Sequence, residues 1–326
     1  MNFFKYNGEG ICKLKKQSVG QLIDVTLWRK FNEIEAYAEG ARAKEIITCP
    51  TNIPFPFLIS NHKYLFKQSN KNFPAQFWVE AIAFRLGCLM DVPVPPAFIG
   101  FDRQYGTAGA VIEWFYDYPG ESPEGYTRGG DLISTLIDNY DRKKGTQHNF
   151  MDIITIIEGL NLSKNWQVDW VRLFCFDALI GNTDRHQDNW GVIRSEEGDY
   201  FSPAFDNGTA MGHEILEPDL DKKLHSFDKY VLGNHARHRL KWDRNDHNRI
   251  KHFDFLQQLI IHYPNMKQHM QACLEFSKES IAQEIYGLLD LSNTLPEPYA
   301  KLTSNRANFI IKLTEYRLEK ALEILT

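Results

Sequence analysis

The most informative stretch of the sequence is Leu179-Ile-Gly-Asn-Thr-Asp-Arg-His-Gln-Asp-Asn189, which is followed by Pro203-Ala-Phe-Asp-Asn-Gly208. In the first stretch, Asp184 stands five residues before Asn189. The second stretch carries another aspartate, Asp206, directly before an asparagine and a glycine. The segments around these two polar loops indicate whether the loops meet in space.

Those segments have clear structural patterns. Residues 165–180 are apolar nearly all round, which is typical of a buried helix, and Gly181 suits the left-handed residue at a helix end. Residues 190–193 and 199–202 have the composition of two short strands joined by a turn. A helix, a loop, a hairpin and a second loop in this order would bring the two aspartates and the asparagine around one point.

The residue types at this point match one kind of chemistry. Phosphoryl transfer from ATP needs a carboxylate that orients the attacking hydroxyl, and an amide oxygen and a second carboxylate that hold magnesium. The protein-kinase catalytic loop has the pattern D-x-x-x-x-N, and a metal-binding aspartate follows it. The spacing therefore predicts an ATP-dependent kinase with Asp184 as a catalytic residue and Asn189 and Asp206 as Mg2+ ligands. His186, in the same loop, is a further catalytic candidate.

Two other interpretations of these loops are open. The same spacing arises by chance in solvated polar loops, so the motif gains its meaning from the elements around it. His186 and Asp188 could also form a transition-metal site with Asp184. Zinc sites usually draw three or four His, Cys or carboxylate ligands, and no cysteine lies nearby, so the oxygen-rich set favours magnesium.

Composition narrows the class of protein. At 326 residues and 43% apolar content, the chain can bury a large core. The net charge of -5 argues against a general nucleic-acid or membrane-surface binder, so we expect no direct DNA binding. Five scattered cysteines suggest thiols in a reducing compartment, and no apolar run reaches membrane-spanning length. These features predict a cytoplasmic location.

The distribution of patterns predicts an α+β, two-lobed, protein-kinase-like fold. Residues 1–115 are mostly strand-like with one helix, and we assign them to an N-lobe built on a small mixed sheet. Residues 116–326 are mostly helical, and we assign them to a C-lobe that ends in an amphipathic helix over 303–325. The segment 116–128, rich in Pro, Gly and Glu, is the predicted seam.

The N-lobe offers candidates for holding the nucleotide phosphates. The small residues of Tyr37–Lys44 would let backbone N–H groups approach phosphates, although an ordinary turn has the same composition. Its candidate residues are Gly40, Ala41, Arg42 and Lys44. Lys67 ends a strand and is the predicted phosphate lysine, with Lys63 as the alternative. Glu80, in a predicted helix, lies among apolar residues and needs a cationic partner, for which Lys67 is the obvious choice.

Another strand, over 108–115, runs into the seam, where the backbone of a two-lobed kinase pairs with adenine. Our candidates for that contact are Glu113, Trp114 and Phe115. With this order of elements, the chain resembles the HipA family of bacterial serine/threonine kinases, the toxins of HipA/HipB-type toxin–antitoxin modules. The residues that carry the resemblance are Gly40-Ala-Arg-Ala-Lys44, Lys67, Glu80 with Val92-Pro-Val-Pro95, Glu113-Trp-Phe115, and above all the Asp184 to Asn189 loop with Phe205-Asp206.

The resemblance implies a function and partners. ATP would bind through Lys67, and the acceptor would be a protein seryl or threonyl hydroxyl, in an aminoacyl-tRNA synthetase or another translation factor. An antitoxin partner is implied as well. About 36 residues precede the phosphate loop, so the chain resembles compact members without the extra N-terminal subdomain. Tyr37–Lys44 contains no Ser or Thr, which argues against self-inactivation by phosphorylation of that loop.

Alternatives from other classes remain at this point. The same fold could phosphorylate a small molecule or a lipid headgroup, and a catalytically inactive nucleotide-binding partner would share much of the sequence pattern. The segment 234–252 is rich in Arg, Lys and His. We interpret it as a solvated connection between helices rather than as a surface that steers an acidic partner, because charge runs are more often solvated.

Overall fold

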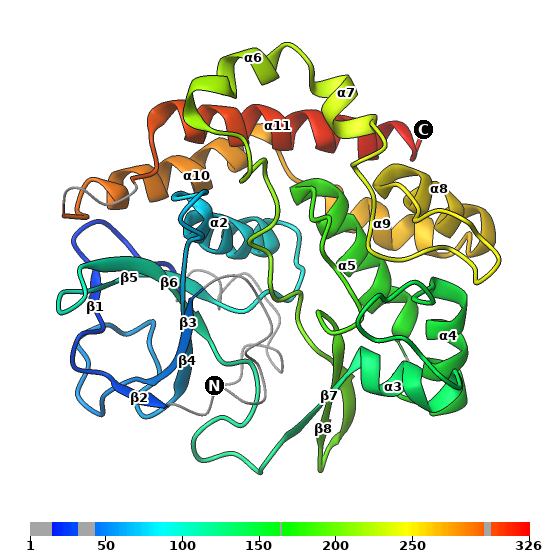
Figure 1. Cartoon of the computed structure of the whole chain (residues 1–326), viewed down its shortest axis with the longest axis horizontal. Coiled ribbons are helices and arrows are strands. Elements are labelled where there is room, and N and C mark those ends of the chain that lie inside the picture. The colour runs from blue at the N-terminus through cyan, green and yellow to red at the C-terminus, as the bar shows by residue number, and fades with distance from the viewer. Residues whose placement is uncertain (1–14, 32–42, 164, 297–300) are drawn as a thin grey trace.

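The computed structural model describes residues 15–31, 43–163, 165–296 and 301–326. These residues form a sheet-based part and a mainly helical part, which lie side by side (Figure 1). Mixed sheet first and helices afterwards is the predicted α+β, two-lobed arrangement. Within the described ranges, none of the helices combines the length and apolar character that crossing a membrane requires.

The first part is built on a six-stranded sheet with the order β1-β5-β6-β4-β3-β2 among the described residues. Its strands are β1 (Ile23–Asp24), β2 (Arg29–Phe31), β3 (Lys44–Thr48), β4 (Lys63–Gln68), β5 (Ala97–Asp102) and β6 (Thr107–Glu113). Neighbours pair antiparallel, except that β1 is parallel to β5. Helix α2 (Gln76–Leu89) packs on this sheet, and nearly all its residues are buried.

The second part holds a small antiparallel sheet, β7-β8-β9, and the remaining helices. Its elements are β7 (Gly125–Arg128), α3 (Gly129–Leu136), α4 (Phe150–Gly159), α5 (Trp166–Ile180), β8 (Gly191–Ser195), β9 (Gly198–Phe201), η2 (Glu217–Asp219), α6 (Leu220–Leu224), α7 (Phe227–Leu232), α8 (His252–His262), α9 (Met266–Leu274), α10 (Lys278–Ser292) and α11 (Ser304–Glu323). The predicted seam over 116–128 is irregular only in its first part. Its last four residues form β7, which pairs with β8 of the hairpin.

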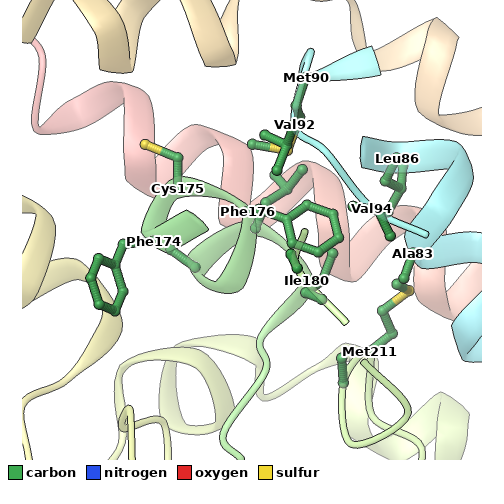
Figure 2. Close-up of a cluster of buried hydrophobic side chains, with 14 of the residues drawn as sticks. Ala83, Leu86, Met90, Val92, Val94, Phe174, Cys175, Phe176, Ile180 and Met211 are labelled. Carbon is green, nitrogen blue, oxygen red and sulfur yellow. The ribbon is translucent and has the colours of Figure 1, made fainter. Parts of the chain in front are cut away.

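Helix α5 forms the centre of the second part and contributes to the core it shares with α2. Figure 2 shows Phe176 and Ile180 of α5 in one cluster with Ala83 and Leu86 of α2. The helix ends at Gly181, which has a φ of 70° and accepts the left-handed conformation without a Cβ penalty. The end of a rigid buried helix therefore fixes where the next loop begins.

The C-terminal helices return to the first part of the chain. α10 lies beside α2 (Figure 1), and the two helices pack together. Arg85 of α2 donates to Glu284 of α10 at 3.3 Å, and Lys16 pairs with the same carboxylate. Because α2 is covered by the sheet on one side and by α10 on the other, it is buried almost all round.

The cysteines differ in part from the expectation. Cys49, Cys175 and Cys273 are buried free thiols, and burial raises the pKa of each, to about 12 for Cys49 and about 11 for Cys273. Cys88, by contrast, is disulfide-bonded. The prediction that the cysteines are all thiols is therefore wrong for Cys88.

Three buried histidines make the second part sensitive to acid. Burial lowers the pKa of His148 to about 4 and of His252 to about 3, and it holds the pKa of His238 well below its ordinary value of 6.5. Each ring is therefore neutral in the folded state but takes up a proton below pH 6.5 when the chain unfolds. Their contribution to stability is complete above pH 6.5 and is lost as the pH falls toward 4, by up to about 1.4 kcal/mol per histidine and pH unit.

Replacing His238 with Phe should flatten this pH dependence. Neither nitrogen of His238 has a hydrogen-bond partner within the described residues, and its ring packs against Phe174, Phe255 and His252. A phenyl ring keeps these contacts and has no site to protonate. The part of the decrease in the free energy of unfolding at acidic pH that His238 causes should therefore disappear. Urea unfolding at pH 7.0 and pH 5.5 measures the difference, and an unchanged pH slope in His238→Phe would contradict the assignment.

Candidate active site

Two carboxylates, one from α2 and one from the loop after β9, meet at the Lys67 ammonium. Lys67, near the end of β4, is only 5% exposed, and its Nζ donates to Oε1 of Glu80 on α2 at 2.8 Å. The same Nζ also donates to Oδ1 of Asp206 in the loop after β9. The pairing of Lys67 with Glu80 that the sequence suggested is therefore present, and it extends to the second acidic loop.

Lys63, the alternative phosphate lysine, lies elsewhere. It begins β4, where about 13 Å of extended strand separates it from Lys67. Its side chain is half-exposed and lies 3.8 Å from the Asp117 carboxylate. The position of Lys63 therefore offers no contact with the acidic loop.

The loop that carries Asp206 is fixed to α2. Asp206 has a φ of 57°, a left-handed conformation that Asp tolerates better than most residues but that still carries strain. The backbone N–H of Asn207 donates to Glu80 Oε2 at 3.1 Å, and Gln76 Nε2 donates to the Gly208 carbonyl at 2.9 Å. Helix α2 thus positions both the Lys67–Glu80 pair and the loop.

The loop after α5 holds its aspartate by short-range hydrogen bonds. The side-chain oxygen of Asn182 accepts from the Asp184 N–H at 2.9 Å and from the Thr209 hydroxyl at 3.2 Å. Asn189 Nδ2 donates to the Asp184 carbonyl at 2.8 Å. The Asp184 carboxylate itself is 37% exposed, and Arg239 Nε lies 3.4 Å away. An acceptor molecule could therefore reach this carboxylate from solvent.

Arg185 joins the two loops, and the sequence interpretation missed it. Its buried guanidinium makes a bidentate pair with Asp177 of α5, at 3.0 and 2.8 Å. It also donates to the Asn189 carbonyl at 3.1 Å, to Asn207 Oδ1 at 2.8 Å and to the Phe205 carbonyl. Burial raises the pKa of Asp177, and the charge of Arg185 opposes that rise. The sequence did contain a signal for this contact. Asp177 lies among apolar residues in the predicted helix, and a buried carboxylate needs a cationic partner.

The segment predicted to contact adenine is only partly available for a ligand. Trp114 donates its N–H to the Lys63 carbonyl at 3.1 Å, and its own carbonyl lies 2.7 Å from His62 Nε2. The Glu113 N–H donates to the Pro96 carbonyl at 2.8 Å, but proline has no N–H with which to return the bond. The Glu113 carbonyl and the Phe115 backbone are thus better candidates than Trp114.

The Glu113 side chain points away from this role. It is 1% exposed and accepts hydrogen bonds from Lys15 at 2.6 Å, Tyr118 at 3.2 Å and Tyr64 at 3.3 Å. These three partners satisfy a carboxylate that is buried inside the first part of the chain. The side chain therefore supports the strand end, and only the Glu113 backbone is a binding candidate.

The phosphate-loop candidates are only partly described. Gly40, Ala41 and Arg42 lie outside the described residues, as does Tyr37. Lys44 begins β3 and stands directly opposite Lys67 in the antiparallel pairing. Residues opposite each other in such a pair place their side chains on the same face of the sheet, so Lys44 shares its face with Lys67.

The remaining candidates are His186 and the Mg2+ ligands. His186 lines a hollow beside the loop, and its Nδ1 accepts from the Asp188 N–H at 3.2 Å. Asn189 uses its amide nitrogen within the loop, which leaves its side-chain oxygen as an acceptor for a hard cation. Together with the Asp206 carboxylate, this donor set fits magnesium. No three His, Cys, Asp or Glu side chains form a metal-binding group in the described part of the chain.

Comparison with known proteins identifies a relative. No protein-family model matches the sequence. The serine/threonine-protein kinase CtkA of Helicobacter pylori is 27% identical over 165 residues, which make up 49% of this chain and 48% of that protein. The alignment thus spans about half the length of this curated relative.

The solved structure of CtkA agrees with this relationship. The crystal structure of the H. pylori proinflammatory kinase CtkA superposes with a TM-score of 0.69 at 19% identity, covering 93% of this chain and 96% of that one. A Shewanella oneidensis complex of HipA, HipB and operator DNA gives a TM-score of 0.47 at 13% identity, covering 93% of this chain and 73% of that one. The likeness to CtkA confirms the predicted kinase-like fold. A bacterial serine/threonine kinase is thus a relative of this chain, as the resemblance to HipA-like kinases suggested.

Proposed function

We propose that this chain is an ATP- and magnesium-dependent protein serine/threonine kinase. The main support is the meeting of Lys67, Glu80 and Asp206 beside the loop that carries Asp184 and Asn189. A buried ion pair across a strand and a helix, linked to an acidic loop, is the arrangement that phosphoryl transfer requires. The relationship to CtkA supports the same activity.

The geometry suggests a separate catalytic role for each of these residues. The Asp184 carboxylate, exposed and held by its own backbone contacts, orients the acceptor hydroxyl and accepts its proton. Lys67 is held by Glu80, so its ammonium is positioned to neutralise negative charge on the transferred phosphoryl group. Asn189 and Asp206 would hold magnesium, which when bound offsets charge on the ATP phosphates.

The nucleotide base would lie at the end of β6. The Glu113 carbonyl can accept from the exocyclic amine of adenine, and the Phe115 N–H can donate to a ring nitrogen. The Phe115 ring stacks on Phe205, with centroids 5.1 Å apart, directly before Asp206. This pair of rings would provide an apolar surface between the base and the loop whose Asp206 would hold magnesium.

The acceptor and partners follow from the resemblance alone. We propose a cytoplasmic, growth-arresting toxin that phosphorylates a translation-related protein, for example an aminoacyl-tRNA synthetase, and that an antitoxin restrains. Incubating a cell lysate with the protein and heavy-isotope ATP, followed by mass spectrometry, tests this. A labelled protein serine or threonine is the expected result. Label found only on metabolites or lipids would replace the proposal with a small-molecule or lipid kinase.

Lys67→Ala should weaken nucleotide binding much more than Lys63→Ala. ATP with magnesium stabilises the folded state by mass action, so it should raise the melting temperature of the wild-type chain. At saturation, each tenfold loss of affinity removes about 1.4 kcal/mol of that stabilisation. Lys67 contacts both Glu80 and Asp206, whereas the carboxylate that Lys63 pairs with among the described residues, Asp117, is exposed.

Each variant's shift should be compared with its own melting temperature without nucleotide. This reference is needed because Lys67→Ala also leaves Glu80 buried without its cation. A larger loss of the nucleotide shift in Lys63→Ala would show that the phosphate lysine is assigned to the wrong end of β4.

A further inference from the structure

A basic hollow lies directly beside the candidate catalytic aspartate. It has a volume of about 570 Å³ and contains one carboxylate, Asp188, among its lining residues. The basic side chains that line it are Arg128, Arg142, Lys143, Lys144, Arg239 and Arg249. The whole chain has a net charge of -5, so this concentration of positive charge is local.

The basic side chains that line the hollow come from separate segments of the second part. Arg128 ends β7, Lys143 and Lys144 follow α3, and Arg239 and Arg249 come from the segment between α7 and α8. The latter segment is the one that the sequence suggested was a solvated connection. The segment does connect two helices, α7 and α8, and residues 244–248 are exposed, but two of its arginines also line the hollow beside the candidate catalytic loop.

Some of these cations are already neutralised by the protein. Arg142 donates to both oxygens of Asp188, at 3.0 and 3.3 Å from its Nε, and also pairs with Asp131. Lys144 lies 3.3 Å from Asp141. Arg142 therefore shapes the wall of the hollow, and a ligand would gain little from its charge.

Other cations retain uncompensated charge. Within the described residues, no carboxylate lies within ion-pair distance of Lys143 or Arg249. Partial burial and the positive charge of Arg239 lower the pKa of Arg249, and the Asp184 carboxylate opposes this shift. An anion entering the hollow would relieve this repulsion.

We propose that this hollow binds an acidic side chain of the protein acceptor, close in sequence to the serine or threonine that is phosphorylated. This proposal rests on the proposed kinase function and specifies its substrate class. Arg239 contacts the Asp184 carboxylate and also lines the hollow, so an acceptor hydroxyl at Asp184 would place its neighbouring residues against the basic wall. Both a carboxylate and a phosphorylated side chain have the required charge.

Three protein acceptors test whether the hollow prefers carboxylates, phosphorylated side chains or neither. Phosphorylated casein offers phosphoserines and carboxylates, dephosphorylated casein offers carboxylates only, and myelin basic protein offers a basic sequence. We expect kcat/KM for either casein to exceed that for myelin basic protein. Preference for phosphorylated over dephosphorylated casein would identify phosphate as the better anion. Equal or better use of the basic protein would overturn the proposal, whereas transfer to none of them would instead count against the kinase function.

A double variant tests the residues. Lys143→Ala with Arg249→Ala should raise KM for casein about tenfold, leave KM for ATP unchanged and weaken the dependence of the rate on salt. The matched control is Lys222→Ala with Lys312→Ala, which also removes two positive charges, from exposed positions on α6 and α11. An equal rise of KM in the control variant would show a general charge effect and overturn the assignment.

A short RNA provides the remaining comparison. If an RNA oligonucleotide binds the wild-type chain, loses binding in the Lys143/Arg249 variant and displaces casein, the hollow is an RNA site and the proposal is wrong. If casein phosphorylation is insensitive to the RNA, the acidic-acceptor proposal is supported. Unchanged KM for casein in the double variant would also overturn it, whatever the RNA does.

Discussion

Replacing Asp184 with Asn should lower the rate of phosphoryl transfer by about a thousandfold or more and leave the fold unchanged. An amide can still occupy the site, but it cannot accept the proton of the attacking hydroxyl, and a general base contributes about 10²- to 10⁴-fold. The carboxylate is 37% exposed, and its neighbour Arg239 is also exposed, so little stability depends on it. The measurement is kcat on the acceptor that the lysate experiment identifies, together with the melting temperature.

Asp221→Asn provides the matched control for this prediction. Asp221 is an exposed aspartate on α6, so the substitution changes the same charge away from the site. It should keep wild-type kcat. Asp206→Asn should also abolish transfer, because it weakens both the contact with Lys67 and the predicted metal ligand. Near-normal kcat in Asp184→Asn would remove this residue from the mechanism.

The second large effect concerns Arg185. Arg185→Ala should lower the free energy of unfolding by about 3–5 kcal/mol, the typical cost of leaving a buried charge without its partner. The uncompensated charge would be that of Asp177, which is 0% exposed within α5. Urea unfolding of the purified chain measures the change.

Two further variants separate the effect of the uncompensated buried charge from the effect of losing an arginine. Arg172→Ala removes an arginine of the same helix region whose partner, Asp91, is 60% exposed, so its cost should stay below about 1 kcal/mol. Asp177→Ala together with Arg185→Ala should recover part of the lost stability, because no buried charge remains. Activity should stay low in the double variant, since the contacts of Arg185 with Phe205 and Asn207 are still absent. Recovered activity would show that Arg185 does not position the two loops.

The sequence was informative wherever a physical cost is visible locally. A buried glutamate needs a cation, so the pairing of Glu80 with Lys67 could be predicted from composition and order. The apolar character of α5 and the glycine after it predicted the helix and its end, and the structure places both as expected. These patterns depend on residues that are neighbours in the chain or that lie on consecutive elements.

Contacts between distant segments could not be predicted in this way. Nothing local indicates that Arg239 comes to lie beside Asp184, or that Glu284 pairs with Arg85. The engagement of the Trp114 backbone by His62 and Lys63 depends equally on how separate strands end. In each case the packing of whole helices and strands determines which residues meet, and the hydrophobic periodicity of a single segment carries no information about that packing.

The packing of α10 against α2 has a consequence for the order in which the protein forms during synthesis. The ribosome releases α2 early, but its covering partner, residues 278–292, is made much later. Until then one side of α2, the helix that holds Glu80, lacks the apolar and charged contacts that bury it. The Lys67–Glu80 pair should therefore become stable only after α10 has emerged, so a nascent chain stalled before residue 278 would not yet bind nucleotide.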